Sequence, residues 1–108
     1  MVRYTRAVGD GVTELLLTEL LLTEVALDKL GARNISAEEA EQLLRNAHIV
    51  VRNQRAPDPG SRRLLIGRTD GQRGLTLVIE RTLEPTTWLG ITGWESTDVE
   101  RKLLPSER

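Results

Sequence analysis

Cysteine is absent from the 108 residues, and histidine occurs once, as His48. The absence of cysteine excludes disulfide bonds, thiolate metal sites and cysteine nucleophiles. A single histidine without cysteine cannot supply the usual ligands of a zinc site, so we expect neither a metal nor another cofactor. The composition is compatible with a reducing compartment, and we expect a cytoplasmic protein.

Aromatic residues are also scarce, because phenylalanine is absent and only Tyr4, Trp88 and Trp94 represent tyrosine and tryptophan. The core is therefore expected to consist of leucine, isoleucine and valine. Thr18 and Glu19 interrupt the apolar run at residues 15–22, which is too short to span a bilayer. We expect no membrane partner, and a hydrophobic fraction of 39% with 29% charged residues is typical of one globular domain.

Charge is unevenly distributed along the chain, although the formal net charge is only −1. Residues 45–81 carry eight arginines and three acidic residues, a net charge of +5, whereas residues 1–44 carry −4 and residues 82–108 carry −2. Arginine forms bidentate contacts with phosphate and stacks on bases. The middle segment therefore indicates either an anionic partner or a solvated, arginine-rich face.

A tandem repeat of five residues precedes the basic segment. It consists of Thr13-Glu14-Leu15-Leu16-Leu17, Thr18-Glu19-Leu20-Leu21-Leu22 and the degenerate Thr23-Glu24-Val25-Ala26-Leu27. Leucine and glutamate favour helix, although a period of five fits neither helix nor strand. We expect a helix over roughly residues 12–24, within an N-terminal extension at residues 1–23. Two interpretations stay open: a contact with a partner, such as a homo-oligomer through residues 15–27, or a duplication that adds a non-essential extension.

Residues 24–108 are expected to form a single α+β domain. Ser36 and Glu39 have the spacing of a capping box at the start of a helix, which ends near Asn46. From His48 onward the pattern is typical of strands, which we expect over residues 49–51, 63–68, 75–81 and 88–94.

Short loops join the expected strands, so antiparallel pairing is predicted. Asp70-Gly71 is a strong hairpin-turn signal, and Ser96 or Thr97 is expected to cap a short helix over residues 98–104. The predicted fold class is α+β, with two N-terminal helices, a four-stranded antiparallel sheet and a short C-terminal helix.

Arginines on or beside the expected strands are the main chemical resource of the chain. RNA carries its own nucleophile, the 2′-hydroxyl, so a metal-free enzyme needs mainly to position it, neutralise the phosphorane and move a proton. Guanidinium groups meet the second need, and His48 could meet the third. The candidate RNA-binding side chains are Arg52, Arg62, Arg63, Arg73 and Arg81, with Arg55 beside them and Trp94 as a stacking platform. A core or solvated role is the alternative for His48 and for at least one tryptophan.

Several short segments occur in the order and spacing of a known toxin family. They are Asp28-Lys29-Leu30, NISAEEA at residues 34–40, LLIGRTDG at residues 64–71, LTLVI at residues 75–79, ITGWES at residues 91–96 and Glu100-Arg101. Over roughly residues 24–104 the chain resembles the BrnT-type toxins, which are RelE-like ribonucleases paired with a DNA-binding antitoxin.

The resemblance implies a RelE-like fold and a toxin that inhibits translation by metal-independent cleavage of mRNA. It also implies an antitoxin protein that covers the basic sheet. Lys29 and Arg68 match basic residues of the family pattern by position, so the candidate catalytic residues are Lys29, His48 and Arg68. Trp94 stands where the family pattern has an arginine. The alternative is a non-catalytic RelE-like module that binds RNA or a partner protein.

Overall fold

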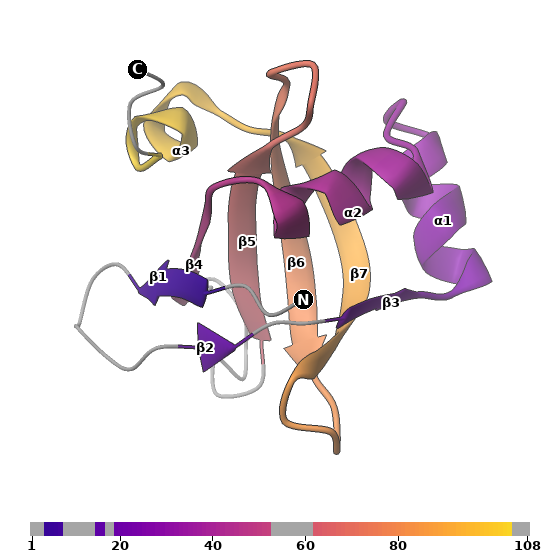
Figure 1. Cartoon of the computed structure of the whole chain (residues 1–108). Coiled ribbons are helices and arrows are strands. Elements are labelled where there is room, and N and C mark those ends of the chain that lie inside the picture. The colour runs from indigo at the N-terminus through magenta and orange to yellow at the C-terminus, as the bar shows by residue number, and fades with distance from the viewer. Residues whose placement is uncertain (1–3, 8–14, 17–18, 53–61, 105–108) are drawn as a thin grey trace.

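A sheet of seven strands runs through the computed structural model, which describes residues 4–7, 15–16, 19–52 and 62–104 (Figure 1). In chain order these strands are β1 (Tyr4–Ala7), β2 (Leu15–Leu16), β3 (Glu19–Leu22), β4 (His48–Arg52), β5 (Arg62–Arg68), β6 (Gly74–Arg81) and β7 (Thr87–Glu95). The helices within the described ranges are α1 (Glu24–Gly31), α2 (Ala37–Arg45) and α3 (Asp98–Lys102). The predicted α+β class is confirmed.

The strands β4, β5, β6 and β7 are the four that the sequence predicts, and they pair antiparallel in this order. The turn between β5 and β6 contains Asp70 and Gly71, as predicted. Gln72, the next residue, takes the left-handed conformation with φ 71°. The predicted antiparallel core of the sheet is therefore confirmed, together with its hairpin.

Three further strands, which the sequence pattern does not predict, extend the sheet at its edges. β1 pairs parallel with β4 and antiparallel with β2, while β3 pairs parallel with β7 at the opposite edge. Leu16 of β2 and Glu19 of β3 are three Cα steps apart, so their Cα atoms lie at most about 11 Å from each other. The two edges of the sheet are thus close together, and the sheet bends around the face that carries α1 and α2.

The prediction of a helix over residues 12–24 is wrong for the described part of that range. β2 and β3 occupy it, and the first helix, α1, begins only at Glu24. Leu20 of β3 lies in the core and is 5% exposed, whereas Leu21 is 43% exposed. Pairing with β7 buries Leu20 and supplies backbone hydrogen bonds, and this tertiary gain outweighs the helix propensity of leucine. Residues 19–22 therefore form an edge strand of the sheet.

α1 and α2 each begin at a residue whose side chain accepts a hydrogen bond from the first turn. Thr23 Oγ1 accepts from the Ala26 backbone N–H at 3.2 Å. At α2, Ser36 Oγ accepts from the Glu39 N–H at 3.0 Å, and Glu39 Oε1 accepts from the Ser36 N–H at 3.1 Å. The predicted capping box is confirmed, and it fixes the Glu39 carboxylate at the first turn of α2.

We call the face of the sheet that α1 and α2 cover the inner face (Figure 1). Leu30 of α1 and Leu43 of α2 pack there with Leu65 and Leu77 of the strands, and all four side chains are buried. Gly93 of β7 permits this approach, because a Cβ at that position would lie 2.5 Å from Leu77 Cδ2 and 3.1 Å from Leu30 Cδ2. Apart from Trp88, the main core is aliphatic, as the composition predicts.

The opposite face of the sheet, the outer face, carries α3 at the end where β5 turns into β6 (Figure 1). Thr97 caps α3 and forms a second capping box with Glu100. Leu104, just after the helix, packs on Ile49 and Ile66. The predicted short helix is confirmed with Thr97 as its N-cap. No helix in the described ranges is long and apolar enough to cross a membrane.

Leu20→Ala is expected to lower the free energy of unfolding by about 2–4 kcal/mol, because it leaves a cavity in the core. Leu21→Ala is the matched control, since it makes the same change one residue away on an exposed side chain, and its effect should stay within about 1 kcal/mol. Urea unfolding followed by tryptophan fluorescence measures both variants. Equal losses would contradict the alternation of β3.

Candidate nucleic-acid interface

Arg52, Arg63 and Arg81 lie on the inner face at one end of the sheet, and we call this group the arginine end. β4 and β6 end there, and β5 begins there, so antiparallel pairing brings the three residues together. Side chains alternate between the two faces of a strand, and each arginine lies two positions from a core residue of its own strand. Those core residues are Val50, Leu65 and Ile79.

The register places the three arginines side by side. Arg52 and Arg63 are direct cross-strand partners, which puts their Cβ atoms roughly 5 Å apart. Arg63 pairs with Ile79 of β6, and Arg81 is two positions further on, which makes it a diagonal neighbour at roughly 7–8 Å. Like charges directly opposite each other are unfavourable in an antiparallel pair.

Arg81 packs on Trp88, its cross-strand partner in β7. The guanidinium carbon lies 5.2 Å from the centroid of the indole ring, within cation–π range. Trp88 is 1% exposed and belongs to the core, whereas Arg81 is exposed. Stacking uses the face of a guanidinium and leaves its N–H groups, which lie in the plane, for hydrogen bonds.

Arg62 lies at the same end of the sheet but on the outer face. Its Nε donates to Glu80 Oε1 at 3.1 Å, and both side chains are partly exposed. Arg63 Nη1 donates to the Arg62 carbonyl at 2.9 Å, so the Arg63 side chain is also anchored to the strand. Arg62 is therefore not gathered with the arginine end, and Glu80 balances its charge.

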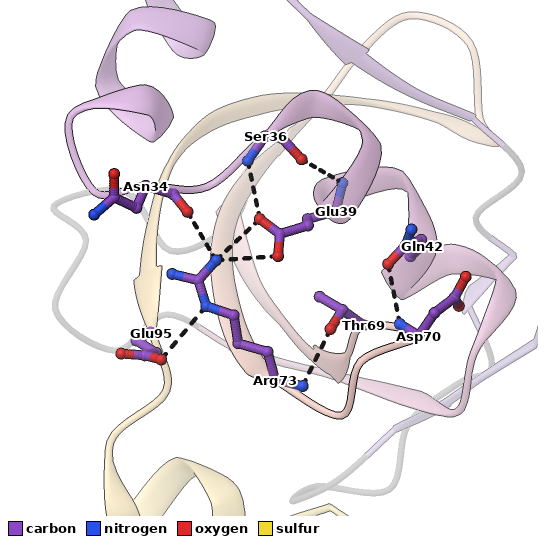
Figure 2. A network of polar contacts seen from close by, with 8 residues as sticks. All are labelled: Asn34, Ser36, Glu39, Gln42, Thr69, Asp70, Arg73 and Glu95. Atoms are coloured by element: carbon purple, nitrogen blue, oxygen red, sulfur yellow. Dashed lines mark hydrogen bonds and ion pairs between the residues drawn. The ribbon is translucent and has the colours of Figure 1, made fainter.

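Arg73 lies at the other end of the sheet, beyond the turn between β5 and β6, where acceptors surround it (Figure 2). Its Nη1 donates to Glu39 Oε1 at 2.9 Å and to the Asn34 carbonyl at 2.7 Å, and its Nε donates to Glu95 Oε2 at 3.4 Å. The Arg73 backbone N–H donates to Thr69 Oγ1 at 3.1 Å. Arg73 therefore has a structural role, because these hydrogen bonds join α2, β7 and the turn.

The charges in this network stabilise each other. The hydrogen bond from the Ser36 backbone N–H lowers the pKa of Glu39 below its ordinary value of 4.5, and Arg73 lowers it further against the opposing effect of burial. Partial burial lowers the pKa of Arg73, but Glu39 and then Glu95 outweigh it and raise this pKa above its ordinary value. Both Glu39 and Arg73 are therefore charged at neutral pH.

The last turn of α2 holds the same β5–β6 turn from another side. Arg45 Nη2 donates to Asp70 Oδ2 at 3.0 Å, and Asn46 Nδ2 donates to Asp70 Oδ1 at 3.1 Å and to the Arg68 carbonyl at 2.9 Å. The Asp70 backbone N–H donates to Gln42 Oε1 at 3.0 Å, which Figure 2 also shows. Asp70 is thus both a turn residue and the anchor of α2.

Trp94 lies on the outer face, where its indole N–H donates to Glu100 Oε1 at 3.1 Å. The Thr76 hydroxyl and the Thr97 backbone N–H donate to the same oxygen, both at 2.9 Å. Burial raises the pKa of Glu100, but the donors from Thr97, Thr76 and Trp94 outweigh it and hold this pKa below 4.5. Trp94 therefore anchors α3 to the sheet, away from the arginine end.

The candidate catalytic residues Lys29, His48 and Arg68 lie in three separate places. His48 is 6% exposed, and its ring donates from Nδ1 to the Asn46 carbonyl at 2.9 Å. Arg68 follows Gly67, the direct partner of His48, so its side chain lies on the opposite face. Lys29 is exposed on α1, which packs on β7, and β5 and β6 separate β7 from β4. The structure does not bring these three residues together.

The acidic partners of the arginines are the polar residues that sequence reasoning misses. Glu80 follows from the register alone, because the Asp70-Gly71 turn places it opposite Arg62 once β5 and β6 are paired. Glu39 and Glu95 have no such local signal, since α2 and the end of β7 reach Arg73 only in the folded chain. Arg55, which we also predict beside a strand, lies outside the described residues.

The chain matches no protein-family model, no curated protein and no solved structure.

The free energy of unfolding is expected to fall as the pH drops below about 4.5. A carboxyl whose pKa is lowered by folding stabilises the protein above its unfolded pKa, and this contribution is lost as the pH falls through the folded pKa. Glu100→Gln should lower stability at neutral pH and flatten the acid limb. Urea unfolding across the acid range measures this, with Glu41→Gln, an exposed carboxyl of α2, as the control. An acid limb unchanged by Glu100→Gln contradicts the role assigned to this carboxylate.

Proposed function

We propose that the chain is a non-catalytic RelE-like module that binds single-stranded RNA through the arginine end. The observation that carries this proposal is the placement of Arg52, Arg63 and Arg81 on one face from three adjacent strands. Guanidinium groups form charge-assisted, bidentate hydrogen bonds with phosphate. A row of three such groups suits successive phosphates of one nucleic-acid strand.

Binding and cleavage make different demands on geometry, and this difference favours binding. Cleavage needs a proton-transfer group and cations at a single phosphate. His48 lies within the inner face, Arg68 belongs to the outer face, and Lys29 is on α1. Binding needs only cations along the path of the backbone, and the arginine end supplies these.

A single strand of RNA is the nucleic acid that fits best. Proteins recognise RNA mostly where bases are unpaired, and an arginine side chain can then contact phosphate and stack on a base with the same group. The arginine end covers only three neighbouring strands, so it offers few contacts, which suits a short stretch of one chain. The antitoxin protein implied by the resemblance stays a prediction, and it would compete for this surface.

Fluorescein-labelled oligouridine is expected to bind with an affinity that falls as salt rises. Three phosphate contacts predict a slope of log K against log salt of about −2, since each contact contributes roughly 0.7 on a single strand. Arg63→Ala should reduce the slope by about 0.7 and weaken binding roughly three- to ten-fold at low salt. Arg33→Ala is the matched control, because Arg33 is exposed beside Asn34, at the opposite end of the sheet. A slope of zero, or equal effects of both variants in fluorescence anisotropy, would remove RNA from the arginine end.

Incubation of end-labelled RNA with the protein in EDTA separates binding from cleavage. The proposed function predicts intact RNA, because the structure keeps His48, Arg68 and Lys29 apart. Cleavage that leaves 2′,3′-cyclic phosphate ends, and that disappears in Arg68→Ala, would instead establish the ribonuclease that the resemblance implies.

A further inference from the structure

Trp88 is an unusual choice for a core residue. Its side chain is buried between β3 and β6, where it packs with Leu20 and Ile79. Its indole N–H is also buried, and it finds no hydrogen-bond acceptor among the described residues. A buried donor without an acceptor destabilises a fold relative to an apolar ring of similar shape. The buried N–H therefore weakens this core position relative to an apolar side chain of equal volume.

The contact with Arg81 gives the indole a role that an aliphatic side chain cannot fill. Among aromatic rings, indole attracts a cation most strongly, and the Arg81 guanidinium carbon lies 5.2 Å from its centroid. An exposed arginine otherwise samples many rotamers, and ordering it on binding costs free energy. The ring thus orders Arg81 before any ligand arrives.

We propose that Trp88 is a positioning residue, which holds the Arg81 guanidinium in one orientation on the β7 side of the arginine end, where Arg81 contacts an RNA phosphate. This inference rests on the proposed function and deepens it. Trp88 itself does not touch RNA, because it is 1% exposed. Its effect on affinity must therefore pass through Arg81.

A double-mutant cycle with oligouridine tests the role of Trp88. Trp88→Phe keeps a ring in the core, so the protein should stay folded without urea, although the smaller ring leaves a cavity that lowers the urea midpoint. RNA affinity should fall roughly two- to five-fold, the loss expected from a weaker cation–π contact. In an Arg81→Ala background the same substitution should have no further effect on affinity. A loss of affinity that depends on the presence of Arg81 sets this role apart from a purely structural one, because the cavity lowers stability in both backgrounds.

The remaining outcomes separate this inference from the proposed function. Affinity lost in Arg81→Ala but unchanged in Trp88→Phe would overturn the positioning role and leave RNA binding in place. Equal losses from Trp88→Phe in both backgrounds would also overturn it, because the effect would not pass through Arg81. Arg52→Ala, Arg63→Ala and Arg81→Ala all without effect would defeat the proposed function itself. Should Trp88→Phe fail to fold, Arg81→Lys keeps the charge but not the planar stacking and should show the same roughly two- to five-fold loss of affinity. Full affinity in Arg81→Lys would overturn the positioning role.

Discussion

The pairing register of β5 between β4 and β6 decides which arginines share a face of the sheet. Because side chains alternate along a strand, a shift of one residue would move Arg63 to the outer face and Leu65 away from the core. Leu65 and Leu77 are almost completely buried, and their burial stabilises the register far more than any exposed charge could. The placement of charge at the arginine end is therefore a consequence of aliphatic packing two residues away.

The two ends of the sheet use arginine differently. At the turn between β5 and β6, Arg73 lies between Glu39 and Glu95, which come from elements far apart in the chain, so its charge serves to hold α2 and β7 together. At the arginine end, residues of the same charge are neighbours in the register. The register therefore gives the two ends of the sheet different arrangements of arginine.

Local signals predicted much of the fold, and non-local pairing accounts for what they missed. The Ser36 and Glu39 capping box and the strands from His48 onward follow from residues close in sequence. β3 pairs with β7, far along the chain, and nothing near residues 19–22 indicates that partner. The sequence pattern also does not indicate which face of the sheet Trp94 occupies. Ile91 is an extra residue in β7 opposite β6, and this bulge reverses the alternation of side chains before Trp94. The arginines were predicted on strands, but their faces and their acidic partners depend on register.

The parallel pairing of β3 with β7 also affects how the protein is made. A ribosome delivers β3 early and β7 only after all the other strands, so Leu20 cannot meet Trp88 until most of the chain has left the tunnel. Contacts between distant segments form slowly, since a large loop must close first. During synthesis Leu20 consequently lacks its partner in the core until β7 has emerged, so this edge of the sheet closes late.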